Sequence, residues 1–368
     1  MAMNTPMAAL LIVISLRSRR QPVRTTDPKL GERESAMRLL RASCLATMTF
    51  MLLFGCVSSA LAVPYAFTTI DVPAQLGTST NLQDINDAGN IVGWFVDPAV
   101  GRRRGVLVSG GTFTVIDAPG VSPPTPPDVR TSPTNLNNNG QIVGFFRDAT
   151  VDQPGFEHGF LRQPAGTFTT INAPGAVSTN ANGINDLGAI AGVFRDAAGV
   201  DHGFLRQPDG TFTPINVPGA ASTSANDINN NGLLVGFSTD AMGAETPYLR
   251  NLNGSFSPII VPGATTGEAL GINTLGQITG FFEDTMGVDH GFLRDPDGTF
   301  TTLDPPGSTL TFAVGINGRS QIVGVFLDSS GVQHGFLATP APEPGSLLLL
   351  ASGLAAVSGV AWRRHRRK

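Results

Sequence analysis

Two residue types recur at fixed places along the chain, and both could do chemistry. An aspartate stands four positions after a glycine in six places: Asp97, Asp148, Asp196, Asp240, Asp284 and Asp328. A histidine opens the phrase His-Gly-Phe-Leu in four places: His158, His202, His290 and His334. Carboxylates gathered on one face could bind divalent cations, and histidines could ligate a transition metal.

Each set also has a local structural interpretation. An aspartate before a glycine-containing loop commonly starts an Asx turn, in which its carboxylate accepts backbone N–H groups nearby. Each histidine belongs to a different repeat, and no two stand at the spacing of metal ligands within one element. We therefore interpret both sets as structural: the aspartates fix turns and the histidines fix their own repeat units. The sequence predicts no metal site and no cofactor.

Catalysis is expected at residues that break the symmetry of a repeat. The asymmetric features are the insertion Val151 to Glu157, the proline-rich stretch Ser122 to Pro133, interpreted as a loop, and the cluster Arg102 to Arg104. None contains a nucleophile, a base and an orienting group in a known arrangement. Glu268 and Glu283 could pair as glycosidase carboxylates, but nothing in the sequence places them at a workable separation. We predict no catalytic residues and a protein that is not an enzyme.

The repeats themselves predict the fold. A phrase close to Phe-Thr-x-Ile-x-x-Pro begins at Phe67, Phe113, Phe168, Phe212, Phe256 and Phe300, and the last four are 44 residues apart. Between copies comes Ile-Asn-x-x-Gly-x-Ile-x-Gly, whose Asn and Gly suit tight hairpins. Four short strands in about 44 residues are typical of a propeller blade. We expect an all-β, six-bladed β-propeller of four-stranded blades over residues 63–339.

The order of the phrases indicates how the ring closes. The first copy begins with a lone strand, Phe67 to Ile70, and the last copy ends at Leu337 without the strand that should follow. The N-terminal strand is therefore expected to complete the sixth blade, which leaves no unpaired closing edge. In Thr211 to Ile215 a proline lies inside the strand, so that strand is expected at an edge of its sheet.

From Phe67 to Leu337 the repeat phrase resembles the HAF family of extracellular repeats, with His-Gly-Phe where that family has His-Ala-Phe. That family is named for its repeat, so the resemblance implies location and architecture and no substrate.

The C-terminal 29 residues, 340–368, have a tripartite pattern. Pro342, Glu343 and Pro344 precede an apolar run from Leu347 to Trp362, and five of the last six residues are Arg or Lys. This pattern resembles the PEP-CTERM sorting signal of Gram-negative bacteria. The run of residues 347–362 is short for a bilayer core of about 30 Å, and we expect it to form a transmembrane helix that holds the protein only during export. The resemblance implies cleavage by an exosortase and delivery to the cell surface or matrix.

The N-terminal end also predicts export. Residues 37–62 have a basic start, an apolar centre and the small residues Ala60 and Ala62 before Val63, as a signal peptide requires. Signal peptidase is thus an expected partner, and Val63 is the expected mature N-terminus. Residues 1–36 have no periodicity, and we interpret them as disordered or as lying upstream of the true start at Met37.

The exported part is acidic. Between Val63 and Pro340 it has 24 Asp and Glu, 11 Arg and no Lys, a net charge of −13, whereas the whole chain carries −4. Nucleic acid is therefore an unsuitable partner, because its binding requires cationic side chains at the phosphates. We expect an exported surface or exopolysaccharide-matrix protein with a structural or interaction role. The alternative that stays open is a carbohydrate-binding or carbohydrate-active propeller.

Overall fold

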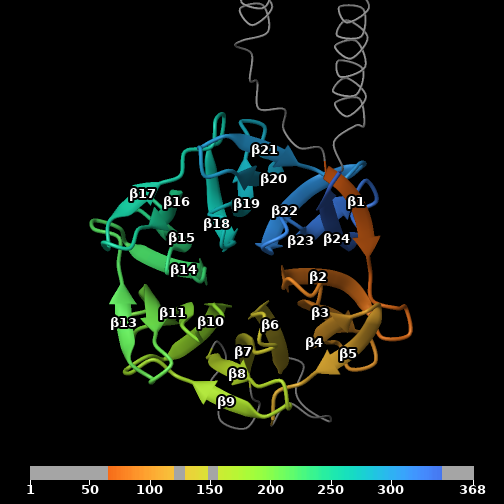
Figure 1. Cartoon of the computed structure of the whole chain (residues 1–368), viewed down its shortest axis with the longest axis horizontal. Coiled ribbons are helices and arrows are strands. Elements are labelled where there is room, and N and C mark those ends of the chain that lie inside the picture. The colour runs from red at the N-terminus through yellow and green to blue at the C-terminus, as the bar shows by residue number, and fades with distance from the viewer. Residues whose placement is uncertain (1–64, 120–128, 148–155, 342–368) are drawn as a thin grey trace, which may run out of the picture. The chain divides into compact units, whose positions relative to one another are not determined.

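The computed structural model describes residues 65–119, 129–147 and 156–341, and within these ranges the regular elements are all β-strands. The strands form six four-stranded antiparallel sheets around a central channel (Figure 1). The predicted all-β, six-bladed propeller with four-stranded blades is confirmed.

Each sheet is one blade, and we number the blades in chain order. Blade 1 contains β2 (Thr78–Ile85), β3 (Ile91–Asp97), β4 (Arg102–Ser109) and β5 (Thr112–Ile116). Blade 2 contains β6 (Arg130–Leu136), β7 (Ile142–Arg147), β8 (His158–Arg162) and β9 (Phe168–Ile171). Blade 3 contains β10 (Ser178–Ile184), β11 (Ile190–Arg195), β12 (Asp201–Arg206) and β13 (Phe212–Ile215).

The second half of the ring repeats this arrangement. Blade 4 contains β14 (Ser222–Ile228), β15 (Leu234–Thr239), β16 (Glu245–Arg250) and β17 (Phe256–Pro258). Blade 5 contains β18 (Thr266–Ile272), β19 (Ile278–Glu283), β20 (Asp289–Arg294) and β21 (Phe300–Leu303). Blade 6 contains β22 (Ser308–Ile316), β23 (Ile322–Asp328), β24 (Gln333–Pro340) and the first strand of the ring, β1 (Tyr65–Ile70).

The first strand of each blade lines the channel, and the Ile-Asn-x-x-Gly phrase turns it into the second strand. In blade 3 the turn needs a positive φ at Gly188, which is +81°, and the Gly188 N–H donates to the Asn185 carbonyl at 3.0 Å. Glycine adopts this conformation without a steric penalty. The sequence phrase therefore sets the register of the two inner strands.

The glycine that ends the phrase, Gly192 in blade 3, is required by close packing. A Cβ on Gly192 would lie 2.2 Å from the Asn180 carbonyl oxygen and 2.5 Å from the ring of Phe204. Phe204 belongs to the His-Gly-Phe-Leu phrase of the same blade and is fully buried. The missing side chain at Gly192 thus leaves room for the ring of Phe204.

The apolar core lies between neighbouring blades. Six buried clusters are present among the described residues, and each combines side chains of two adjacent blades. One of them joins Ile215 of blade 3 to Ile228, Leu234 and Tyr248 of blade 4. Because each blade buries its faces only against its neighbours, the ring must close for the first and last blades to be covered.

The ring closes as expected. β1 pairs with β24 in antiparallel register from Tyr65 opposite Pro340 to Ile70 opposite Gly335. The Phe67 ring packs edge-on against Phe336, with centroids 5.8 Å apart, as Phe300 does against Phe292 in blade 5. The N-terminal strand therefore replaces the fourth strand of the sixth blade, in contacts as well as in pairing.

One expectation about the loops was wrong. The stretch Ser122 to Pro133 was interpreted as a loop, but Arg130 to Pro133 belong to β6, where Thr131 and Ser132 are buried. Pro133 is tolerated on this channel-lining strand because the β6 register shifts between Pro133 and Asn135, and a proline fits at such a bulge. The expectation for Pro214 was correct, since β13 is the outer strand of blade 3.

Several expectations concern residues outside the described ranges: the segment 1–36, the signal peptide 37–62 with Ala60, Ala62 and Val63, Asp148, the motif Pro342 to Pro344 and the helix 347–362. Within the described ranges, no helix has the length and apolar character needed to cross a membrane.

We expect removal of β1 to destabilise the whole ring. Deleting Tyr65 to Ile70 would expose the edge of β24 and uncover Phe336, and each lost large apolar contact is worth about 1.5–3 kcal/mol. The deletion should lower the melting temperature of the purified protein by many degrees in a thermal melt followed by circular dichroism. Truncation after Ala341, which keeps every strand, is the control. Equal melting temperatures for the two variants would contradict closure by β1.

Candidate functional site

The asparagine of each Ile-Asn-x-x-Gly phrase belongs to a ring around the channel. Asn185 shows the pattern: its Oδ1 accepts the N–H groups of Leu187 (3.1 Å) and Ala189 (2.9 Å). Its Nδ2 donates to the backbone carbonyl of Asn229 in the next blade at 3.1 Å. The same inter-blade bond links Asn86 to Asn137 (3.2 Å), Asn137 to Asn185 (3.0 Å), Asn229 to Asn273 (2.9 Å), Asn273 to Asn317 (3.0 Å) and Asn317 back to Asn86 (3.0 Å).

We call these six buried residues the asparagine ring. Every blade donates one hydrogen bond and accepts one, so the cycle is complete only when blade 6 meets blade 1. From the sequence, this asparagine was expected only to favour its own hairpin turn. Its Oδ1 does have that local role, whereas the partner of its Nδ2 lies in the next blade.

The residues that follow the ring asparagines form a further set of polar contacts between blades. Asp186 accepts the Asn138 N–H at 2.7 Å, and also the side-chain amides of Asn138 (3.1 Å) and Asn230 (2.6 Å). Asp87 accepts the Asn138 side-chain amide at 3.0 Å and the Gly318 N–H at 2.7 Å. These contacts extend the inter-blade links to the surface of the channel.

Two positions before the asparagine ring, the blades differ from one another. Blades 1, 2 and 4 have the polar residues Asp84, Asn135 and Asp227, and the other three have Gly183, Gly271 and Gly315. Asp227 accepts the Asn135 side-chain amide at 3.2 Å and the Ile272 N–H at 2.8 Å. Asp84 accepts the Leu136 N–H at 3.0 Å. The Asn135–Asp227 bond therefore connects blades 2 and 4, which are not neighbours, and the two backbone bonds connect adjacent blades.

The glycines make this arrangement possible. A Cβ on Gly183 would lie 2.6 Å from the Asp227 Oδ1, and a Cβ on Gly315 would lie 2.5 Å from the Asp84 Oδ1. Each aspartate thus occupies the space that a side chain of the preceding blade would fill. Asp227 and Asp84 can therefore be accommodated because the preceding blades have glycine at this position.

Burial controls the charge of these two carboxyl groups. Removal from water raises the pKa of Asp227 to about 7. Burial, and then the negative charge of Asp227, raise the pKa of Asp84 well above its ordinary value. Both groups therefore hold a proton more tightly than an exposed aspartate does.

A cavity of about 210 Å³ lies along the same channel-lining strands, further from the asparagine ring. We call it the channel cavity. Asn135, Gly271, Gly315, Phe145 and Glu268 contribute to its lining. The remaining lining residues stand three positions before the ring asparagines: Gln83, Thr134, Asn182, Asn226, Leu270 and Val314. Burial, and then the charge of Glu245, raise the pKa of Glu268 to about 8. Its carboxyl group is therefore largely protonated at neutral pH.

Glu268 and Glu283 do not share this cavity. Thr266 pairs with Glu283 and Glu268 pairs with Phe281, so the two glutamates are two register positions apart on neighbouring strands. Glu268 lines the channel cavity and Glu283 does not. Glu283 instead accepts the Thr265 hydroxyl at 3.2 Å.

The repeated histidines and aspartates are brought together in a contact that we call the histidine latch. In blade 3 the His202 Nε2 lies 3.1 Å from the Asp196 carboxylate, and its Nδ1 lies 3.0 Å from Oδ1 of Asn216. The imidazole also stacks on Phe194, with centroids 5.2 Å apart. The Asp196 Oδ1 meanwhile accepts the backbone N–H groups two and four positions on, in an Asx turn. The sequence marked both residue types but not their contact.

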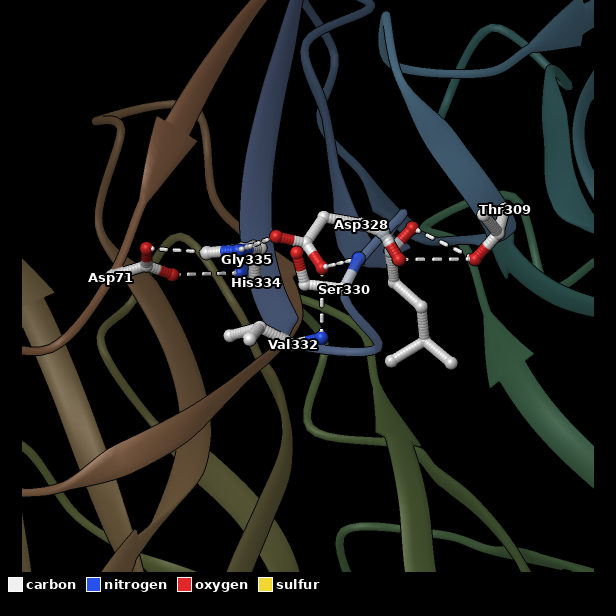
Figure 2. Close-up of polar contacts among 8 residues, drawn as sticks. Asp71, Thr309, Asp328, Ser330, Val332, His334 and Gly335 are labelled. Carbon is white, nitrogen blue, oxygen red and sulfur yellow. Dashed lines mark hydrogen bonds and ion pairs between the residues drawn. The ribbon is translucent and has the colours of Figure 1, made fainter.

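In blade 6 the latch fastens the closing strand. The His334 Nδ1 lies 2.8 Å from Asp71, which follows β1, and its Nε2 lies 3.5 Å from Asp328 (Figure 2). Asp71 also accepts the Gly335 N–H at 3.2 Å, and Asp328 accepts those of Ser330 and Val332 (Figure 2). Residues 263 positions apart in sequence are therefore held by the same contact that acts within blade 3.

The other blades vary the latch. In blade 5 His290 lies 2.7 Å from Asp304 and 3.5 Å from Asp284. In blade 2 His158 lies 2.8 Å from Asn172. In blade 1 an arginine takes the place of the histidine, since Arg104 pairs with Asp97 at 3.0 Å and with Asp117 at 2.5 Å. In blade 4 the corresponding residues are Thr246 and Ile260, so the turn residue Asp240 has no imidazole opposite it.

The latches favour protonated imidazoles. The hydrogen bond with Asp71, against a smaller opposing effect of burial, raises the pKa of His334 above its ordinary value. Contacts with Asn216 and then Asp196 do the same for His202. For His290, burial lowers the pKa, but the contacts with Asp304 and Asp284 outweigh it.

Asp84, Asn135 and Asp227 were missed by sequence reasoning. The available signal was their departure from glycine when the six copies are aligned. Of the residues that the structure describes, no three His, Cys, Asp or Glu side chains gather as metal ligands would.

A comparison with known protein families agrees with the expectation for the tail. The family model described as the PEP-CTERM protein-sorting motif matches residues 340–367, which implies an exported protein that an exosortase sorts to the bacterial cell surface. No curated protein matches the sequence.

Solved structures with a similar fold have low sequence identity. TolB from Acinetobacter baumannii is 14% identical with a TM-score of 0.49, over 69% of this chain and 65% of that one, so this chain spans slightly less than two thirds of the TolB chain. The BP39L lectin from Burkholderia pseudomallei is 15% identical with a TM-score of 0.43, over 74% and 86%. A puromycin hydrolase is 14% identical with a TM-score of 0.47, over 72% and 45%. These are likenesses of fold alone.

We expect the asparagine ring to be a major source of stability. Asn185→Ala removes one inter-blade bond and leaves the N–H groups of Leu187 and Ala189 without their acceptor, which should cost about 2–3 kcal/mol. Urea denaturation measures this loss. Asn231→Ala, at an exposed asparagine, is the control and should cost well under 1 kcal/mol. Similar losses of unfolding free energy for the two variants would show that a ring asparagine contributes no more stability than an exposed one.

The latch of blade 6 should make stability depend on pH. Because folding raises the His334 pKa, its contribution is complete below about pH 6.5, the ordinary pKa of histidine, and is lost as the pH rises through the higher folded value. His334→Gln should therefore lower the melting temperature more at pH 6 than at pH 9. Asp71→Asn should have the same pH-dependent effect, and the double variant should be no worse than either single one. A pH-independent loss would contradict the assignment.

Proposed function

We propose that this protein is a non-catalytic propeller with a structural or interaction role at the cell surface or in the exopolysaccharide matrix of a Gram-negative bacterium. The observation that carries this proposal is the position of the sorting motif. It begins at Pro340, the last residue of β24, so a cut beyond Ala341 leaves all 24 strands in the released product. The signal peptide proposed for residues 37–62 likewise ends before Tyr65, the first residue of β1.

The acidic surface and the resemblance to HAF repeats support an extracellular location. A net charge of −13 over residues 63–340 suits solubility outside the cell. The proposed partners are signal peptidase, exosortase and exopolysaccharide, with the membrane as a transient partner through the proposed helix 347–362.

We expect processing to require an exosortase. The protein recovered from wild-type cells should begin at Val63 and should lack the basic C-terminal end, as terminal sequencing by mass spectrometry would reveal. In cells without the exosortase it should keep that end and sediment with the inner membrane. An unprocessed tail in wild-type cells would overturn this sorting route.

A second candidate function is carbohydrate binding or carbohydrate chemistry. The channel cavity favours it, because amides, a hydroxyl, a carboxyl group and an aromatic ring line one hollow, as in small-molecule sites. A glycan array and a hydrolysis assay would distinguish it from the structural role. Neither binding nor hydrolysis across a broad panel would leave the structural role standing.

A further inference from the structure

The six equivalent positions that line the channel cavity are of two chemical kinds. Blades 1 to 4 contribute the polar side chains Gln83, Thr134, Asn182 and Asn226, whereas blades 5 and 6 contribute Leu270 and Val314. All six are half-buried, so water still reaches them. Phe145 from blade 2 and Glu268 from blade 5 add an aromatic ring and a carboxyl group, so the cavity offers both hydrogen-bonding and apolar groups to a ligand.

Three of these four polar side chains are held in place by the neighbouring blade. The Thr134 hydroxyl donates to the Ala181 carbonyl at 2.7 Å, the Asn182 amide to Ala225 at 3.1 Å, and the Asn226 amide to Ala269 at 2.9 Å. An amide NH₂ has two N–H groups and a carbonyl oxygen accepts two hydrogen bonds. Each asparagine therefore keeps bonding capacity in a fixed orientation, which lowers the entropic cost of binding.

The cavity carries little charge at neutral pH, so it favours a neutral ligand over an ion. Glu268 is the one titratable residue in its lining, and it is mostly protonated at neutral pH. Glu245 on β16 is the charged group that acts on it. On the strands beside it, the corresponding residues are Ser224, Phe312 and Phe281, and none of them titrates. Asp227 on β14, whose pKa is raised to about 7, accepts the amide of the lining residue Asn135 and the N–H of Ile272, but it is buried and does not line the cavity.

The size of the cavity suits a ligand group of about one ring. Its volume of about 210 Å³ is below the roughly 300–1,000 Å³ of sites for drug-sized molecules. Phe145, Leu270 and Val314 offer apolar contacts for the C–H face of such a ring.

We propose that the channel cavity binds one neutral sugar ring, with Asn182, Asn226 and Glu268 bonding its hydroxyl groups and Phe145 with Leu270 contacting its C–H face. This inference rests on the carbohydrate-binding candidate above and gives it a site. The protonated Glu268 donates a hydrogen bond to a sugar oxygen, so ionisation of this group removes a donor and places a charge in the cavity.

Calorimetric titration of the processed protein with a panel of neutral monosaccharides, and with uronic acids as charged counterparts, tests the proposal at pH 6.5. At least one neutral sugar should bind, and its uronic acid should bind at least tenfold more weakly. Asn226→Leu reproduces the leucine that blade 5 already has at this position, so the ring should still fold, and sugar affinity should fall at least tenfold. Asn231→Ala, on an exposed turn next to the asparagine ring, is the matched control and should bind normally.

Glu268→Gln supplies the second readout. It keeps a donor without a titratable group, so its affinity should be within about threefold of the unaltered protein at pH 6.5. At pH 9 it should still bind the sugar, while the unaltered protein loses affinity by up to about tenfold, the limit set by a pKa of about 8. Equal binding of the uronic acid, or affinity unchanged by Asn226→Leu in a folded variant, would overturn this site. If glycan-array binding persists in that case, the carbohydrate-binding candidate survives elsewhere on the propeller. If no sugar binds a folded protein, both fail.

Discussion

The cyclic hydrogen bonding of the asparagine ring is the constraint on which the rest of the structure depends. Each Nδ2 reaches the carbonyl of the next blade, and the last bond, from Asn317 to Asn86, exists only if six blades complete the circle. An open array of blades would be held by contacts between neighbours alone. The ring makes the position of every blade depend on all the others.

The sequence predicted the blades well because their signals are local. Asn185 and Gly188 specify a hairpin through bonds within four residues, and Pro214 marks an outer strand by removing a donor. The same residues gave no hint of partners in other blades. The Nδ2 of Asn185 points to a carbonyl 44 positions away, and the contact of His334 with Asp71 spans 263. Pro133 misled for the same reason, since the bulge that accommodates it is set by pairing with β7.

The candidate site shows the same division. Asp84, Asn135 and Asp227 could have been noticed as departures from glycine, but only the radial arrangement brings them into one channel. The side chain of Glu268 was visible as a carboxylate, whereas its protonation follows from burial that no local pattern encodes. Positions that repeat in every blade hold the ring together, and positions that vary among blades line the channel. The polar side chains that could bind a ligand are therefore found at positions where the six blades differ.

The pairing of β1 with β24 also has a mechanical consequence. Tyr65 and Pro340 lie opposite each other at one end of an antiparallel pair, so the chain enters and leaves the ring at the same point. If both ends were tethered in a membrane during export, tension would act across the pair at that end and break its bonds in succession, as a zipper opens, rather than all together in shear. Release of either tether removes that load. The order and timing of cleavage at the two ends would then determine whether the ring is ever pulled in the direction in which this strand pair opens most easily.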